Sequence, residues 1–266
     1  PGEGSFSAEN CTDCGLGKYS PLEASPLESN CLACVAGKYI DVPGSDQPSD
    51  CIDCVAGKYV AVNGSTDAFD CINCAPGRYL EAAGSDDSEA CIACRPGMFS
   101  NVTTDGRPGG ASSASACTNC TAGSYAPLSE DGALSCRLCG VGLYSEKVGS
   151  DSTADCKTCG AGRFSSAEGA ASEAACEDCV PGQYQATQAA AACIDCAAGK
   201  YSSEAAADEA SDCIDCPPRT FARSASNDAL ADCLACEAGQ FAYDGFTECI
   251  ACPAGKTSDA SSPGRA

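Results

Sequence analysis

The 26 cysteines are the residues whose type and spacing could do chemistry. They form thirteen CxxC pairs, and no cysteine lies outside a pair. Such pairs can bind zinc, act as a redox motif, attach haem or form disulfides. The pairs begin at Cys11, Cys31, Cys51, Cys71, Cys91, Cys117, Cys136, Cys156, Cys176, Cys193, Cys213, Cys233 and Cys249.

Zinc is the main alternative to disulfides, because two CxxC pairs about sixteen residues apart match a zinc-ribbon spacing. Four-cysteine sites use the pairs two at a time, yet these gaps do not alternate between within-site and between-site lengths. A redox CxxC is normally single and starts a helix, and covalent haem needs a histidine, which the chain lacks. The sequence therefore predicts disulfides, with no metal site and no cofactor.

The apolar content is too small for a conventional core. Leu, Ile, Val and Phe number 34 of 266 residues, there is no Trp, and the net charge is -22. Such a composition is typical of a disordered chain unless cross-links restrict the unfolded state. Dense disulfides persist in oxidising surroundings, so we expect an extracellular or cell-surface, secreted protein.

The cysteines belong to a repeat of about twenty residues, which predicts a module array. Twelve copies place Gly three residues after the second cysteine, with Arg219 as the exception, and an aromatic follows two residues later except at Thr257. Short β-forming pairs flank each loop, and a turn glycine such as Gly44 or Gly64 lies inside it. Each loop is therefore predicted to be an irregular β-hairpin. The ring of each aromatic is expected to pack on the cystine and on the next repeat's glycine.

The pattern C-x-x-C-x-x-G-x-Tyr/Phe, as in Cys34 to Tyr39 closing at Cys51, resembles the ephrin-receptor-like cysteine-rich repeats. It is also similar to the first loop of tumour necrosis factor receptor modules. Spacing alone leaves the connectivity open, but this resemblance implies that the second cysteine of each pair bonds to the first cysteine of the next. The implied pairs are Cys14 with Cys31, Cys34 with Cys51, Cys54 with Cys71, Cys74 with Cys91, Cys94 with Cys117, Cys120 with Cys136, Cys139 with Cys156, Cys159 with Cys176, Cys179 with Cys193, Cys196 with Cys213, Cys216 with Cys233, and Cys236 with Cys249.

Two cysteines and four asparagines remain as candidate sites for modification. Cys11 and Cys252 are left over by this pairing, so we expect them to pair outside this stretch or between chains. Asn10, Asn63, Asn101 and Asn119 begin N-x-Ser/Thr sequons and are candidates for glycosylation. The longest loop insertion, 101 to 116, contains one sequon and is expected to project. The aromatic stretch from Phe241 to Phe246 is a candidate docking site or a cap on the last short loop.

The acidic excess, 37 residues against 15 basic ones, excludes nucleic acid as a partner. Weak Ca2+ binding by paired carboxylates is an alternative to a solvated, self-repelling surface. Seven basic residues occupy the repeat position just before that of the aromatic and are expected to pair locally: Lys18, Lys38, Lys58, Arg78, Arg163, Lys200 and Lys256. No histidine is present for general base chemistry, no catalytic residue is predicted, and we do not expect an enzyme. No apolar run approaches the length of a membrane span, so membrane insertion by this segment is not expected.

The predicted fold is an elongated rod of about thirteen cystine-closed irregular β-hairpin loops, in which each unit touches only its neighbours. Residues 1–10 are interpreted as the tail of a shortened repeat, 11–252 as the tandem array and 253–266 as a truncated last repeat. The array resembles those of large secreted or cell-surface proteins of algae and other protists. The expected role is a rigid spacer in an extracellular filament, stalk or mastigoneme-like flagellar hair, partnered by chains of the same or a related filament. The alternative is a ligand-binding ectodomain segment of a cell-surface receptor.

Overall fold

A computed structural model describes residues 12–23, 27–127 and 132–258 of the chain. Its backbone contacts divide the chain into two units, each described here by itself. The first unit comprises residues 1–120 and 126–136, and the second comprises residues 121–125 and 137–266. The proposed shortened repeat at residues 1–10 lies outside the described residues, as does the last part of the proposed terminal repeat.

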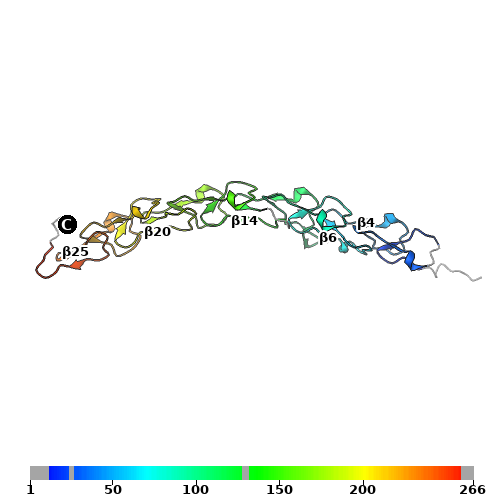
Figure 1. Cartoon of the computed structure of the whole chain (residues 1–266), viewed down its shortest axis with the longest axis horizontal. Helices are drawn as coiled ribbons and strands as arrows, with labels where there is room; N and C mark the ends of the chain where they lie inside the picture. The colour runs from blue at the N-terminus through cyan, green and yellow to red at the C-terminus, as the bar shows by residue number, and fades with distance from the viewer. Residues whose placement is uncertain (1–11, 24–26, 128–131, 259–266) are drawn as a thin grey trace, which may run out of the picture. The chain divides into compact units, whose positions relative to one another are not determined.

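One antiparallel strand pair lies at the base of every cysteine-closed loop. Its first strand ends at the repeat aromatic inside the loop, and its second strand is formed by the two residues that follow the closing cysteine. All strands are two residues long, and Figure 1 draws them as small separate arrows along the chain. The pairs are β1 (Lys18–Tyr19) with β2 (Leu32–Ala33), β3 (Lys38–Tyr39) with β4 (Ile52–Asp53), β5 (Lys58–Tyr59) with β6 (Ile72–Asn73), β7 (Arg78–Tyr79) with β8 (Ile92–Ala93), β9 (Met98–Phe99) with β12 (Thr118–Asn119), β13 (Ser124–Tyr125) with β14 (Arg137–Leu138), β15 (Leu143–Tyr144) with β16 (Lys157–Thr158), β17 (Arg163–Phe164) with β18 (Glu177–Asp178), β19 (Gln183–Tyr184) with β20 (Ile194–Asp195), β21 (Lys200–Tyr201) with β22 (Ile214–Asp215), β23 (Thr220–Phe221) with β24 (Leu234–Ala235), and β25 (Gln240–Phe241) with β26 (Ile250–Ala251). A thirteenth pair, β10 (Thr103–Thr104) with β11 (Arg107–Pro108), lies inside the long insertion.

A single turn of 3-10 helix ends at the residue before the closing cysteine in nine of the loops within the described residues. Several turns end in an aspartate whose carboxylate accepts backbone N–H groups three and four residues earlier, as Asp50 does from Asp46 and Gln47. This contact satisfies donors that the short turn leaves unpaired. The turns are η2 (Glu28–Asn30), η3 (Pro48–Asp50), η4 (Ala68–Asp70), η5 (Ser88–Ala90), η6 (Ala114–Ala116), η7 (Thr153–Asp155), η8 (Glu173–Ala175), η9 (Ala210–Asp212) and η10 (Leu230–Asp232).

The core is a series of small clusters, each centred on one disulfide. In the first unit the buried aliphatics Ile40, Val60 and Leu80 each lie against the cystine of their own loop. No α-helix occurs in the described part of the chain. The prediction of small disulfide-rich hairpin repeats without a large core is confirmed.

Candidate functional site: the repeated cystine joint

The structure contains twelve disulfides, and each joins the second cysteine of one CxxC pair to the first cysteine of the next. They are the same pairs as those the family resemblance implies. The Cα atoms of bonded cysteines are 5.5 to 5.8 Å apart, within the usual range for a disulfide. Cys252 is a free, partly exposed cysteine, and Cys11 lies outside the described residues. We call each disulfide-closed segment a cystine loop and name it by its two cysteines.

The repeat aromatic packs across the joint between consecutive cystine loops. Tyr19 lies against Ile40 and the Cys34–Cys51 disulfide of the following loop, and Tyr39 makes the same contact one loop further on. In the second unit Tyr144 packs on the Cys159–Cys176 disulfide with Ala170. We expected each ring to lie on the cystine of its own loop and on the next repeat's glycine. The observed contact is instead with the next loop's cystine and a buried side chain of that loop.

The motif glycine, three residues after the second cysteine of a pair, is needed for a contact two cystine loops along the chain. Gly37 has a φ of +89°, and a Cβ atom there would lie 2.2 Å from the carbonyl oxygen of Gly84. Gly17 meets Gly64 in the same way, and in the second unit Gly123 meets Gly169. Each loop therefore touches its neighbour and the loop beyond it. The expectation that a unit touches only its neighbours is wrong, because turns ten residues past a second cysteine reach back over one intervening loop.

Backbone hydrogen bonds complete the joint in a fixed pattern. The N–H of Gly44 donates to the carbonyl oxygen of Cys14 at 2.9 Å, and that of Gly64 donates to Cys34 at 2.8 Å. The repeat aromatic also forms a parallel bridge with the residue after this turn, as Tyr19 does with Ser45. The turn glycine thus donates a hydrogen bond from its N–H group to the preceding loop, and its carbonyl oxygen lies close to the motif glycine of the loop before that.

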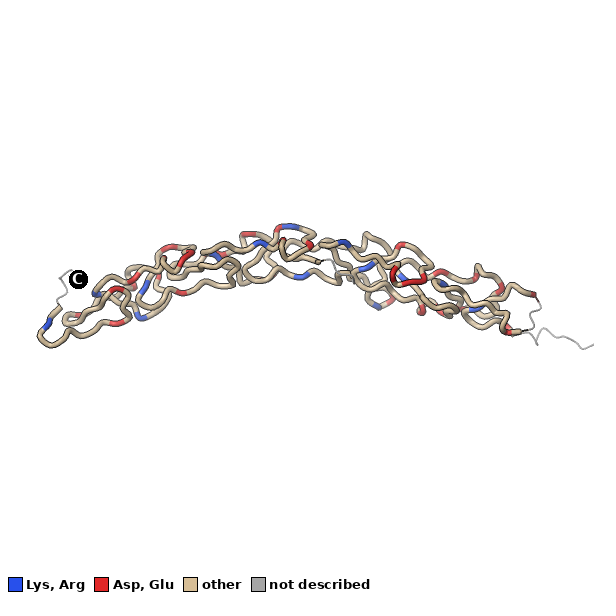
Figure 2. Tube along the Cα trace, in the orientation of Figure 1, with Lys and Arg blue, Asp and Glu red and all other residues tan. Residues whose placement is uncertain are grey.

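Three hairpins combine a charged cross-strand pair with a pair that contains the repeat aromatic. Lys38 and Asp53 stand opposite each other in β3 and β4, and their charged atoms are 2.6 Å apart. The equivalent pairs Arg163–Asp178 and Lys200–Asp215 have separations of 2.9 and 2.7 Å. The predicted local pairing of these basic residues is confirmed at all three positions. Acidic and basic residues are spread along both units, and Figure 2 shows this distribution.

The second cross-strand pair places a residue directly opposite each repeat aromatic. Ile52 lies opposite Tyr39, and Ile214 lies opposite Tyr201. In one loop the residue opposite Tyr144 is Lys157, whose ammonium lies 5.8 Å from the centre of the ring. Both choices shield a ring face, by apolar contact in the first case and by cation–π attraction in the second. The half-exposed aliphatics of the CxxC segments are explained by this pairing.

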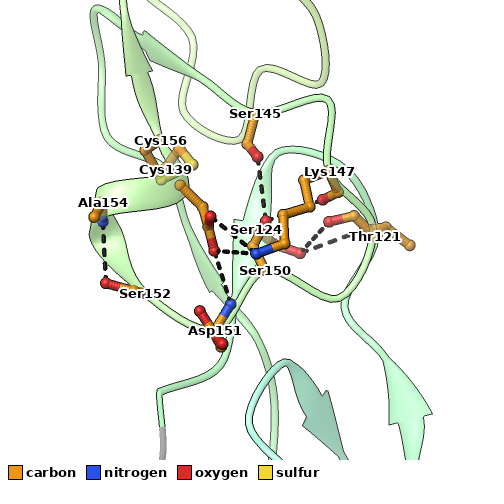
Figure 3. The surroundings of a disulfide bond; sticks show 11 residues. Thr121, Ser124, Cys139, Ser145, Lys147, Ser150, Asp151, Ser152, Ala154 and Cys156 are labelled. Carbon is orange, nitrogen blue, oxygen red and sulfur yellow. Dashed lines mark hydrogen bonds and ion pairs between the residues drawn. A yellow bond between two sulfur atoms is a disulfide. The ribbon is translucent and has the colours of Figure 1, made fainter.

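The Cys139–Cys156 loop shows how the acidic residue beside a cysteine stabilises the turn (Figure 3). The carboxylate of Asp155 accepts two hydrogen bonds from Lys147 Nζ, both at 3.0 Å, and one from the N–H of Asp151. These contacts hold the pKa of Asp155 below its ordinary value of 3.8, and the hydrogen bond from Lys147 contributes most. The same hydrogen bond raises the pKa of Lys147 above 10.5. Sequence reasoning assigned such carboxylates to a solvated surface or to weak Ca2+ binding, and missed this capping role.

The long insertion folds back along its own unit, so the expectation that it projects is wrong. The N–H of Gly110 donates to the carbonyl oxygen of Cys74 at 2.9 Å, and Asn73 donates to the carbonyl oxygen of Thr104 at 3.2 Å. Asp105, at the tip of the β10–β11 hairpin, forms an ion pair with Lys58, whose side chain is only 10% exposed. A buried ammonium requires such a partner, which fixes the insertion against the loops before it.

Three of the four candidate glycosylation asparagines lie in the described residues, and all three are exposed. Asn63 accepts a hydrogen bond from the N–H of Ala36 at 2.8 Å, and the hydroxyl of its sequon partner Ser65 is buried. Asn101 begins the insertion, and Asn119 ends β12. Asn10 lies outside the described residues. Glycosylation at all four sequons stays a prediction.

The aromatic stretch between β25 and β26 forms an edge-to-face stack. The ring centres of Phe241 and Tyr243 are 5.5 Å apart, and those of Tyr243 and Phe246 are 5.4 Å apart. Tyr243 is 65% exposed, while the carbonyl oxygen of Phe246 accepts the N–H of Ala222 from the preceding loop. The stretch is thus anchored at one end and open at its centre.

No group of three or more His, Cys, Asp or Glu residues is placed to hold a metal ion in the parts of the chain that the structure describes. Within those same parts, no helix combines the length and the apolar character that crossing a bilayer requires.

The stapled hairpins and their repeated joint define a disulfide-rich tandem repeat protein. Residues 109–156 and 169–213 match the family described as tyrosine-protein kinase ephrin type A/B receptor-like, so these two segments are ephrin-receptor-like cysteine-rich repeats. None of the curated proteins matches the chain significantly. The disulfides and the family match together indicate an extracellular or cell-surface location.

Proposed function

We propose that the array is a rigid spacer in a secreted extracellular filament, stalk or mastigoneme-like flagellar hair. The observation that carries this proposal is the uniformity of the joint. A disulfide closes every loop between Cys14 and Cys249, the glycine contact recurs in both units, and the aromatic packing seen at three joints of the first unit is found again in the second. Loop length is the main variable. A structure built from one repeated contact is suited to setting a distance.

The proposed partners are other chains of the same or a related filament, and no catalytic activity is proposed. Cys11 and Cys252 are the proposed positions for disulfides that continue the array, within a longer chain or between chains. Glycans at the exposed Asn101 and Asn119 would increase the solvation of the filament surface.

Negative-stain electron microscopy of the protein from its native source, without reductant, tests the spacer function. Regular fibres whose axial period matches the array are expected. Isolated particles with a globular or membrane-embedded part at one end would contradict the filament role.

A second candidate is the ligand-binding segment of a receptor ectodomain, which the family description favours. The exposed Phe241–Tyr243–Phe246 stack is its docking surface in this hypothesis. Tyr243→Ala should then abolish capture of a specific extracellular ligand by the full chain while the disulfides stay intact. Under the spacer hypothesis the same substitution leaves filament length and period unchanged.

A further inference from the structure

The disulfide connectivity determines which part of the chain transmits a pulling force. Because each disulfide joins the two ends of a cystine loop, tension passes through the S–S bond and bypasses the loop. Between Cys14 and Cys249 the chain has 235 peptide steps, of which the twelve disulfides enclose 202. The remaining 33 steps are the eleven CxxC links, each three steps long.

The tension path is uniform even though the loops are not. The sequence separation inside a disulfide ranges from 13 in the Cys236–Cys249 loop to 23 in the Cys94–Cys117 loop. The link between consecutive disulfides is always three residues, and the bonded Cα atoms are 5.5 to 5.8 Å apart throughout. The β10–β11 insertion therefore adds mass and contacts without lengthening the path.

We infer that the array is a tension-bearing tether whose maximum length is set by its CxxC links and disulfides and is independent of its loops. This inference rests on the proposed spacer function and adds a mechanical property to it. Fully extended, the oxidised segment from Cys14 to Cys249 spans about 190 Å, from ~3.6 Å per peptide step plus the disulfide spans. The same segment without disulfides would span about 850 Å.

Single-molecule force extension of the full chain tests the inference. Terminal peptide handles are attached, and Cys11→Ser and Cys252→Ser keep the pulled species a single chain. Without reductant, extension is expected to stop at about 190 Å plus the contribution of the residues outside Cys14–Cys249. Adding a phosphine reductant under tension should then produce discrete steps of about 55 Å for each 17-residue loop. Steps of that size before reductant is added would overturn the inference.

Two variants test which segments of the chain belong to the tension path. Cys94→Ala with Cys117→Ala should lengthen the oxidised molecule by about 75 Å, because the 23-residue loop joins the tension path. Deleting residues 103–108 should leave the oxidised length unchanged and shorten only the reduced molecule, by about 20 Å. A deletion that shortens the oxidised molecule contradicts the inference. Failure of the spacer role itself would instead appear in the micrographs, as particles without fibres, with these extension limits intact.

Discussion

At the scale of single residues, the position after each repeat aromatic decides how apolar a joint is. Ile40, Val60 and Leu80 occupy it in three consecutive loops of the first unit, and each is at most 4% exposed. Ser145 and Ser202 occupy it in the second unit, and both are fully buried. A buried hydroxyl favours folding only when it is hydrogen-bonded, so the effect of each serine on stability depends on whether its hydroxyl has a hydrogen-bond partner.

Ser202→Ala is expected to stabilise its loop by about 1 kcal/mol, because the Oγ atom of Ser202 is buried with no partner in the structure. Ser145→Ala is the matched control, because the Oγ atom of Ser145 lies 3.2 Å from that of Ser150, within hydrogen-bond distance (Figure 3). Removing this hydroxyl should leave the stability of the fold unchanged or lower it. Denaturant unfolding under non-oxidising, non-reducing conditions measures both. Equal destabilisation by the two substitutions would contradict the assignment.

Lowering the pH should destabilise the Cys139–Cys156 loop. Because the folded-state pKa of Asp155 is lowered, by Lys147 and then by the Asp151 N–H, its ionised form stabilises the fold above its ordinary pKa of 3.8. That contribution is lost as the pH falls through the lowered folded-state pKa. An NMR titration of the Asp155 carboxyl carbon, with amide exchange at Asp151, follows the transition. Lys147→Met should move the pKa back toward 3.8, and a wild-type midpoint at or above that value would refute the role.

At the scale of elements, the two-residue hairpins are too short to be stable alone, and the glycine contact holds them in register. Gly37 lies against the carbonyl oxygen of Gly84, whereas Gly239 has a similar positive φ and none of the residues that the structure describes lies within 4 Å of its Cβ position. Comparing substitutions at the two glycines therefore distinguishes the cost of the backbone conformation from the cost of the close contact.

Gly37→Ala is expected to cost about 2–4 kcal/mol, because a left-handed alanine is strained and its Cβ overlaps the backbone of Gly84. Gly239→Ala should cost only about 1 kcal/mol, for the backbone conformation alone. Urea unfolding of the disulfide-intact proteins compares them. If both variants lose the same stability, the contact between a loop and the second loop along is not what requires glycine.

The hairpins and their closing cysteines could be predicted because each is marked by residues within one repeat. The contact from Gly37 to Gly84 could not, since every repeat offers a similar turn and the sequence does not say which turn meets which glycine. The insertion was misplaced for a related reason. Lys58 has the same repeat position as Lys38 and Lys200, but Asn73 stands opposite it where those lysines face an aspartate. The pattern therefore shows that an acidic partner of Lys58 must lie elsewhere, without showing that this partner is Asp105.

At the scale of the whole molecule, the close glycine contacts join loops that are two apart along the chain, which predicts short-range cooperativity. Stability in such arrays is a sum of local terms and interface terms, so damage should spread only as far as the contacts do. In the second unit the Cys139–Cys156 loop meets the following loops through Gly142, whose Cβ position lies 2.2 Å from the carbonyl oxygen of Ala189.

Replacing Cys139 and Cys156 by alanine should therefore remove about 3 kcal/mol of stability locally, the entropy of closing a 17-residue loop, without unfolding the chain. Native-state hydrogen exchange is expected to accelerate between residues 139 and 193, which cover the opened loop and the two loops that follow it, and to stay unchanged between residues 34 and 91. Removing Cys34–Cys51 is the reciprocal control, with faster exchange from residue 12 to residue 91 and none in the second unit. Uniform acceleration along the chain in either variant would show that the array folds as a single cooperative body, and that contacts reaching two loops do not set the range of its coupling.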